Sequence, residues 1–188
     1  MAESSPSRPL EDPRWIQETP HQAPPVTGIL AIYNRGDRRR WYWPCLNCDF
    51  YFEGSFRMIE WDHTLADKTE ASESCFMVCP NCDFKLRPHM RRDMNEAGVW
   101  LKDGQSIDHA TKRIVGRATR SRLATFWLKG VAATFISWEK MVYNYLTAEE
   151  DYRRTLSEDS LKKFWNTDEA EPYVPKNVET IRTPQALK

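Results

Sequence analysis

The chain has no excess of charge of either sign and no long apolar run. Its 188 residues include 27 lysines and arginines and 27 aspartates and glutamates, so the formal net charge is zero. No apolar stretch approaches the roughly 18 residues that a membrane-spanning helix requires. We therefore expect no membrane partner, and the overall charge by itself selects neither a nucleic acid nor a lipid surface.

Signatures of nucleotide binding and of catalysis are also missing. The sequence contains neither a G-x-x-x-x-G-K-[ST] loop nor a G-x-G-x-x-G turn, the two motifs that usually hold nucleotide phosphates. No aspartate lies in an apolar strand that would hold it rigidly beside a catalytic metal ion. The candidates considered are Asp62, Asp67, Asp93, Asp103 and Asp108. The chain as given is therefore predicted not to be an enzyme.

Cysteine is scarce, and the five cysteines do not suit a disulfide framework. Five is an odd number, C-x-x-C spacing is awkward for ordinary bridges, and nothing at the N-terminus resembles a signal peptide. We therefore expect a reducing, cytosolic environment. Cys75 is the thiol left over, interpreted as a small half-buried apolar residue; a spare metal ligand and a redox-sensitive thiol are the alternatives.

The other four cysteines lie in two near-identical hexapeptides, CLNCDF from Cys45 and CPNCDF from Cys79. Each C-x-x-C pair places two sulfurs on one tight turn, and two such turns facing each other make a tetrahedral zinc site. The repeated asparagines and aspartates suit turns with left-handed backbone angles. The sequence predicts one structural Zn²⁺ per chain, closed to water and substrate, with the ligands Cys45, Cys48, Cys79 and Cys82.

Short apolar segments on both sides of each knuckle predict an α+β fold built on a zinc ribbon. Residues 38–43 and 50–53 form the first hairpin in this interpretation, and residues 75–78 and 84–86 form the second. The loop between them, residues 53–74, is expected to pack on the ribbon through Met58, Ile59 and Trp61. Because the apolar fraction is only 40%, the metal is expected to contribute much of the stability.

Helices are predicted after the ribbon. Pro88 and Gly98 mark the start and stop of a three-turn helix whose methionines are expected to face the core. After Ser137, apolar residues recur at helical spacing through residue 146, and residues 160–166 repeat the pattern. These two helices are expected to form an antiparallel pair across a connection at residues 151–157. Residues 28–33 suit either a strand or a brief helical turn.

Proline-rich ends complete the predicted organisation. The first 28 residues contain six prolines and read as an extended arm. The predicted divisions are this arm at residues 1–28, the zinc ribbon at 29–87, a helical and basic segment at 88–170, and a linker at 171–188.

Basic residues next to aromatic ones are the remaining functional signal. Guanidinium groups pair with phosphates, and aromatic rings stack on bases. The alternative is a solvated charged face above a tryptophan core. Between Lys112 and Lys129 there are six basic residues and no acidic one. The candidate nucleic-acid contacts are Arg38, Arg39, Arg40, Arg113, Arg117, Arg120 and Arg122.

The four histidines are expected to be exposed, with metal ligation as a minor alternative. They are His21, His63, His89 and His109.

Six segments in a fixed order carry a family resemblance. They are ESSPSRP from Glu3, GILAIYNRGDRRRWYWPCLNC from Gly28, CPNC from Cys79, AGVW from Ala97, ATFWLKGVAATFISW from Ala124 and NTDEAEPYVP from Asn166. In this order they resemble the middle of a bacteriophage terminase large subunit of the lambda-type packaging-motor family. That family joins an N-terminal ATPase to a C-terminal metal-dependent nuclease, with a cysteine-rich insertion between them.

The resemblance implies roles for particular residues. Ser4 and Ser5 are similar to the ATPase coupling motif, while the Walker lysine would lie upstream of Met1 and the nuclease carboxylates beyond the last residue. Ala170 stands where the family pattern has glycine. The chain would then be a non-catalytic zinc-ribbon linker that supports viral DNA packaging in the cytoplasm of the bacterial host. Its partners would be the ATPase and nuclease domains or the small terminase subunit, and double-stranded DNA.

Two other functions remain open from the sequence. A free-standing, truncated phage product could act through protein–protein interaction, by competing with an intact terminase. An independent zinc-ribbon protein that binds nucleic acid would use the same cysteines and arginines. Both alternatives keep the zinc site, so the cysteine pattern alone does not separate them from the linker.

Overall fold

The computed structural model describes residues 2–8, 12 and 14–176. The expected linker at 171–188 is therefore described only up to Lys176, and its remaining residues lie outside the described part. Within the described residues, no helix combines the length and apolar character needed to cross a membrane.

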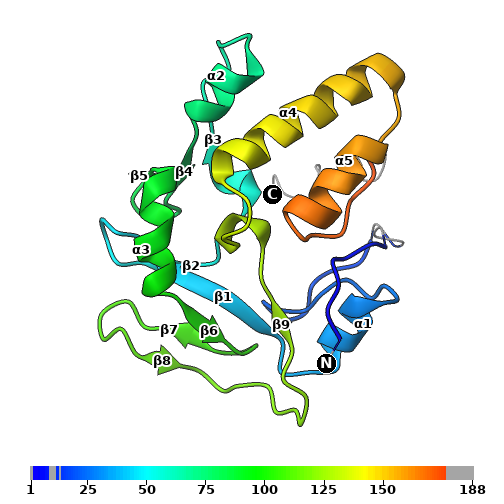
Figure 1. Cartoon of the computed structure of the whole chain (residues 1–188). Coiled ribbons are helices and arrows are strands. Elements are labelled where there is room, and N and C mark those ends of the chain that lie inside the picture. The colour runs from blue at the N-terminus through cyan, green and yellow to red at the C-terminus, as the bar shows by residue number, and fades with distance from the viewer. Residues whose placement is uncertain (1, 9–11, 13, 177–188) are drawn as a thin grey trace.

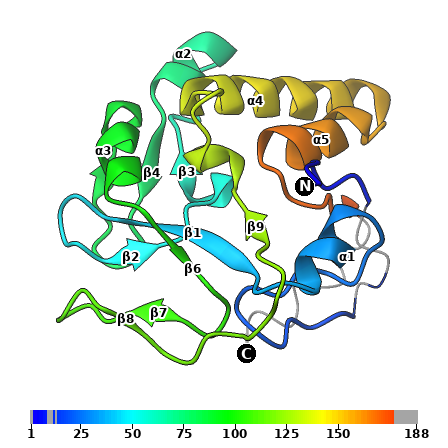
Figure 2. The same cartoon turned by 60° about the horizontal axis from the view of Figure 1, so that its bottom comes forward.

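The central sheet is organised around strand β1 (Arg39–Pro44), which lies across the middle of the molecule (Figures 1 and 2). It pairs antiparallel with β2 (Tyr51–Phe52) and β6 (Val99–Leu101), and parallel with β9 (Phe126–Trp127). The β1–β2 hairpin carries the first cysteine pair at its turn, as the sequence predicts.

A second, three-stranded sheet contains the other hairpin. Its antiparallel order is β3 (Ile59–Glu60), β4 (Phe76–Val78) and β5 (Lys85–Leu86), and the second cysteine pair lies between β4 and β5. A separate hairpin, β7 (Ser106–Ile107) with β8 (Ile114–Val115), projects at one end of the molecule (Figure 2). The result is a mixed fold of helices and small, mainly antiparallel sheets, in agreement with the predicted class.

The segment predicted as a loop at residues 53–74 contains more structure than expected. A 3₁₀ turn η1 (Phe56–Met58) leads into β3, and a helix α2 (Lys68–Glu73) follows. Asp67 caps α2, because its carboxylate accepts hydrogen bonds from the backbone N–H groups of Thr69 and Glu70. The prediction that this segment packs on the ribbon is confirmed, since Ile59 is buried and pairs with Met77 of β4.

The helices follow the local signals closely. Residues 28–33 give the short helix α1 (Ile29–Asn34), and Pro88 opens a 3₁₀ turn η2 (Pro88–Met90) that continues as α3 (Arg91–Glu96). Helix α4 (Trp138–Thr155) begins after Ser137, whose hydroxyl accepts a hydrogen bond from the Lys140 N–H. Helix α5 (Asp159–Lys163) continues in a π-helical turn, Phe164–Asp168, and lies beside α4 (Figure 1).

The predicted connection at residues 151–157 is wrong, because α4 runs on to Thr155. Tyr152 extends the apolar stripe of this helix and packs against the cluster formed by Ala148, Leu161 and Tyr173. Leu156 then ends the helix in a left-handed conformation, with φ of 59°. The turn between the two helices is therefore only residues 156–158.

One main core connects the two hairpins to the helices. Trp43, Trp138, Met77 and Met94 are at most 1% exposed within it, and Cys45 and Cys79 belong to the same cluster. The expectation that the methionines of the helix after Pro88 face the core is confirmed at Met94. The metal-site cysteines are thus part of the core that the strands and α4 enclose.

The N-terminal arm docks on the central sheet through His21. This side chain is fully buried: its Nδ1 lies 2.8 Å from the Arg38 carbonyl oxygen and its Nε2 lies 3.1 Å from the Tyr42 hydroxyl. The expectation that His21 is exposed is therefore wrong, because both ring nitrogens find partners inside the protein. Burial lowers the pKa of this imidazole, which favours its neutral form.

Gly130 permits the closest backbone approach in the C-terminal half. A Cβ at this position would overlap the carbonyl oxygen of Asp168, and the Gly130 N–H donates to the Glu169 carbonyl at 3.0 Å. Ala170, where the family pattern has glycine, adopts φ of 59°. Ala170 therefore adopts the left-handed backbone conformation that glycine would adopt more easily at this position.

Replacing Gly130 with alanine should destabilise the fold by about 3 kcal/mol, because the new methyl group has no space against the Asp168 backbone. Denaturant midpoints measure this change. Gly28→Ala is the matched control: Gly28 has φ of 88° with open space around it, so only backbone strain of about 1 kcal/mol is expected. Equal, small effects at the two positions would contradict the close approach.

Candidate metal centre

The four cysteines of the two knuckles meet at one point between the hairpins. Their sulfur atoms all lie within 4.8 Å of one another, and no histidine or carboxylate belongs to this group. Two Sγ–Sγ distances, Cys45 to Cys82 and Cys48 to Cys79, are 3.8 Å each. Both of these contacts cross from one knuckle to the other, so the hairpins face each other as the sequence predicts.

This spacing matches the edges of a metal tetrahedron. With Zn–S bonds of about 2.3 Å, tetrahedral geometry places the sulfurs about 3.8 Å apart. A disulfide would need about 2.0 Å, and all five cysteines are free. Four sulfur donors this close together suit a soft divalent ion such as Zn²⁺, and four ligands of this kind would leave no open coordination position.

The two knuckles have the same backbone geometry. Asp49 and Asp83 both adopt φ of 56°, and their N–H groups donate to the carbonyls of Cys45 and Cys79 at 2.8 and 3.1 Å. The left-handed conformation predicted for the repeated aspartates is therefore confirmed. For the asparagines that part of the prediction is wrong, because neither of them has a positive φ.

The asparagines instead donate hydrogen bonds to sulfur. The Asn47 backbone N–H lies 3.4 Å from the Cys45 sulfur, and its side-chain amide reaches across to Cys82 at 3.6 Å. Asn81 repeats the pattern, with distances of 3.5 Å to the sulfurs of both Cys79 and Cys48. The repeated asparagines are visible in the sequence. That each of their side chains reaches a sulfur of the opposite knuckle depends on how the two hairpins face each other.

Protonation of the thiols depends on this environment. Burial raises the pKa of Cys45 and raises that of Cys79 to about 12. At Cys48 burial acts in the same direction, but hydrogen bonds from the Asn81 side chain and the Phe50 backbone outweigh it and lower the pKa to about 7. Since metal ligation needs thiolates, a bound cation would supply the charge that keeps all four sulfurs ionised.

Cys75 lies outside the four-sulfur group. It is 1% exposed, and burial raises its pKa to about 12. Its packing in the core agrees with the interpretation as a small apolar residue, but the prediction that it is only half-buried is wrong. A thiol this deeply buried and this weakly acidic is a poor nucleophile, so the structure gives no support to a redox role.

The three arginines before the first knuckle are paired within the chain. Arg38 contacts Asp103 at 2.6 Å, Arg39 contacts Asp37 at 2.8 Å, and Arg40 contacts Glu53 at 3.1 Å. The Arg40 guanidinium is also buried over the Trp127 ring, 3.8 Å from its centroid. These carboxylates already occupy the guanidinium groups that the sequence suggested for nucleic-acid contact.

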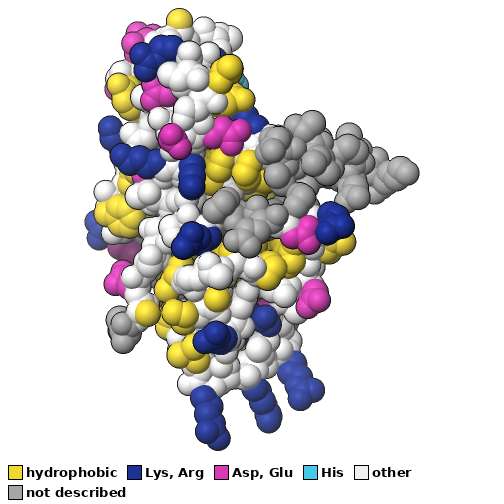
Figure 3. Space-filling model, turned by 90° about the vertical axis from the view of Figure 1, so that its right-hand side faces the viewer, with side chains coloured by type: hydrophobic (Ala, Val, Ile, Leu, Met, Phe, Trp, Pro, Cys, Tyr) yellow, Lys and Arg dark blue, Asp and Glu magenta, His cyan; other side chains and the backbone are white. Residues whose placement is uncertain are grey.

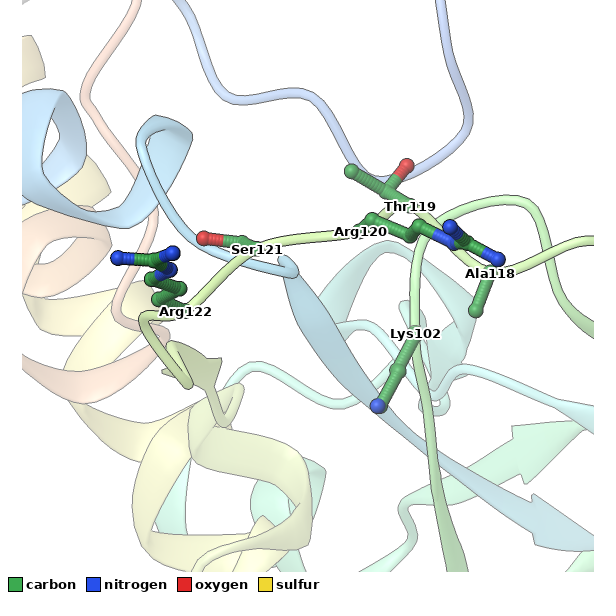
Figure 4. Close-up of a pocket in the computed structure, with 6 residues that line it drawn as sticks. All are labelled: Lys102, Ala118, Thr119, Arg120, Ser121 and Arg122. Atoms are coloured by element: carbon green, nitrogen blue, oxygen red, sulfur yellow. The ribbon is translucent and has the colours of Figure 1, made fainter.

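The second group of arginines is exposed. Arg113, Arg117, Arg120 and Arg122 form no ion pair within the described part of the chain. We call these four residues the basic ridge. Figure 3 shows basic side chains projecting from the lower end of the molecule, and Figure 4 shows Arg120 and Arg122 leaving the backbone in different directions.

The backbone under the basic ridge is held in place. The Thr119 N–H donates to the Asp103 carbonyl at 2.8 Å, and the Ser121 hydroxyl donates to the Arg35 carbonyl at 3.1 Å. A Cβ at Gly104 would overlap the Arg117 carbonyl, so the two segments pass in close contact. At the other end of this segment, the Lys112 ammonium donates to the Asp49 carbonyl of the first knuckle at 3.1 Å.

Two facing knuckle hairpins with a four-sulfur cluster define a mixed α/β protein compatible with the zinc-ribbon class. Comparison with known families identifies it further. Residues 1–100 match the family described as phage terminase large subunit gpA, ATPase domain, and residues 123–186 match terminase large subunit gpA, endonuclease domain. Since the first match spans more than half of the chain, the protein belongs to the phage terminase large subunit family.

The two matches divide the chain differently from the sequence-based organisation. The ATPase match includes both knuckles, and the endonuclease match begins within the segment interpreted as helical and basic. No curated protein and no solved structure matches the chain. The family membership supports a role in phage DNA packaging, and the resemblance found in the six sequence segments is confirmed.

Substituting Asn47 or Asn81 with alanine should weaken zinc retention about 10- to 100-fold, because each change removes a hydrogen bond to a ligand sulfur on the opposite knuckle. Competition with a chelator at fixed pH measures this loss. Leu46→Ala serves as the control, since Leu46 lies in the same knuckle and is 41% exposed. A similar loss in the control would assign the effect to general packing of the knuckle.

Proposed function

We propose that this chain is a zinc-stapled junction in a phage terminase large subunit, joining the ATPase-matched and endonuclease-matched parts during DNA packaging. The observation that supports it most directly is the clustering of the four sulfurs within 4.8 Å of one another, with two contacts of 3.8 Å between the hairpins. In this proposal Cys45, Cys48, Cys79 and Cys82 hold one structural Zn²⁺.

A structural metal here would supply stability that the small sheets lack. The strands beside the knuckles are two to six residues long, and isolated hairpins of that size are marginal in water. Structural zinc binds small peptides with about 10–16 kcal/mol, comparable to the whole stability of a typical domain. Zinc would therefore fix the position of the β4–β5 hairpin against β1 and β2.

Contacts between the two matched parts favour a rigid junction. Strand β9 of the endonuclease-matched part pairs with β1 of the ATPase-matched part, and the Trp43 and Trp138 rings lie 6.4 Å apart in the shared core. Arg40 also stacks on Trp127 across the same boundary. A single core that spans both parts would transmit force between them without a flexible hinge.

The proposed junction has no catalytic role of its own. Four of the five aspartates that the sequence offers for metal-dependent cleavage have other side-chain contacts in the structure. Asp62, Asp67 and Asp108 accept hydrogen bonds from neighbouring residues in local turns and a helix cap, while Asp103 is buried and paired with Arg38. These arrangements support a bracing function over phosphodiester cleavage.

Replacing Cys45 or Cys82 with alanine should reduce the zinc content from one ion per chain to none and cause loss of folded structure. Elemental analysis of the purified protein together with circular dichroism measures both effects. Cys75→Ala is the control and should keep one zinc, because its sulfur lies outside the cluster. Chelation of the wild-type protein gives a second measurement: full folding without metal, or two metals per chain, would contradict the proposal.

A second candidate function is DNA contact by the basic ridge, whose four exposed arginines form no ion pair with any residue that the structure describes. The hollow in Figure 4 is lined by Lys102, Arg120 and Arg122, whose side chains point in different directions and do not converge on one point. Such a spread suits several phosphates along a DNA backbone better than one small anion. In this proposal the Arg38–Arg40 group has only a structural role.

Changing Arg117, Arg120 and Arg122 together to alanine should weaken DNA binding and reduce the slope of log K against log salt by up to about 3, near 0.9 for each lost phosphate contact. Fluorescence titrations of duplex DNA at several salt concentrations measure the slope. The control changes Arg153, Lys162 and Lys163, which are exposed on α4 and α5. Equal slopes in the wild type and the ridge variant would exclude this contact.

The proposed partners are the rest of the terminase large subunit and the small terminase subunit, in the cytoplasm of the host. A free-standing competitor of an intact terminase is the remaining alternative. Pull-down with a separate, intact large subunit distinguishes the two, because a competitor should be captured as a stable complex.

A further inference from the structure

The turn at residues 166–171, which we call the clasp, holds two distant segments at once. The Glu169 carboxylate accepts a hydrogen bond from the Phe56 N–H at 2.8 Å, and its carbonyl accepts one from the Gly130 N–H at 3.0 Å. The Trp127 indole N–H donates to the Ala170 carbonyl at 2.7 Å. The clasp thus joins the start of η1, in the ATPase-matched part, to β9 and the segment that follows it.

Glu169 is an unusual residue for this position. Its side chain is completely buried, and its second carboxylate oxygen, Oε2, has no hydrogen-bond partner. An ionised carboxylate buried in this way would lack both water and a full set of donors. A neutral carboxylic acid would avoid most of that penalty while still accepting the hydrogen bond from Phe56 through Oε1.

The charged groups around Glu169 are already matched with one another. Lys129 pairs with Glu171 at 2.5 Å, and Arg40 pairs with Glu53 at 3.1 Å. On the side of η1, the exposed Arg57 stacks on the Trp165 ring, with its guanidinium 4.4 Å from the ring centroid. Neither of these two ion pairs includes Glu169.

We propose that Glu169 is held as a neutral acid and that the clasp is a proton-linked latch, whose loss of a proton loosens residues 166–171 from Phe56 and Gly130. This inference goes beyond the junction proposed above, because it concerns how firmly the two matched parts are held at different pH. It depends neither on zinc nor on DNA.

The electrostatic environment supports the latch. Burial raises the pKa of Glu169 to about 8, and the nearby Glu171 carboxylate acts in the same direction. Lys129 and hydrogen bonding by the Phe56 backbone and the Ser55 side chain oppose them without cancelling the rise. Because this value lies above the ordinary 4.5, the closed clasp keeps a proton that the open clasp releases. Closure is therefore most stable at low pH, weakens as the pH rises toward 8, and changes little above that.

Amide hydrogen exchange on the full chain tests the latch. Between pH 6 and 8, after correction for intrinsic exchange rates, the opening equilibrium reported by the Phe56 and Gly130 amides should rise by up to tenfold per pH unit. Glu169→Gln cannot lose a proton, so its opening equilibrium should be independent of pH. Glu96→Gln, at an exposed pair with Arg92, is the control and should keep the wild-type slope.

A wild-type opening equilibrium that does not vary with pH, or the same slope in Glu169→Gln, would overturn the proposal. Direct titration of the Glu169 carboxyl by carbon NMR gives a second measurement that needs no variant. A midpoint near 8 supports the neutral acid, and a midpoint below 5 excludes it. Neither readout depends on packaging activity, so failure of the latch would be distinguishable from failure of the proposed junction.

Discussion

Gathering four sulfurs at one point is the constraint on which the rest of the structure depends. Two hairpins separated by more than 20 residues must face each other so that the sulfurs of Cys45 and Cys82, and of Cys48 and Cys79, approach to 3.8 Å. Cys45 and Cys79 also lie in the main core, in contact with the strands that precede them. Metal ligation would therefore fix the position of β1 relative to β4, and α4 packs on the surface that they form.

A second set of interactions joins the two halves of the chain. Pairing of β9 with β1, the stacking of Arg40 on Trp127 and the hydrogen bonds of the clasp all cross from the ATPase-matched part to the endonuclease-matched part. In a packaging motor, force generated by ATP hydrolysis must reach the DNA through connections that do not yield. A core that spans both parts suits the proposed junction better than a flexible linker would.

Local signals in the sequence predicted much of this fold, and long-range contacts account for what it missed. The knuckles, the helix that follows Ser137 and the helix after Pro88 depend on neighbouring residues and were predicted correctly. Pairing of β9 with β1 and burial of His21 depend on residues far away in the sequence, which no local pattern reveals. The arginines show the same limit. Nothing local in the sequence separates Arg38 from Arg113, but among the described residues Arg38 forms an ion pair, with Asp103, and Arg113 forms none.

X-ray absorption at the zinc edge on the purified chain tests the central claim most directly, because it reports the donor atoms and their distances without altering the protein. The account predicts a first shell of four sulfurs at about 2.3 Å and no nitrogen or oxygen ligand. A shell that contains fewer than four sulfurs, or added light atoms, would contradict a closed site formed by Cys45, Cys48, Cys79 and Cys82.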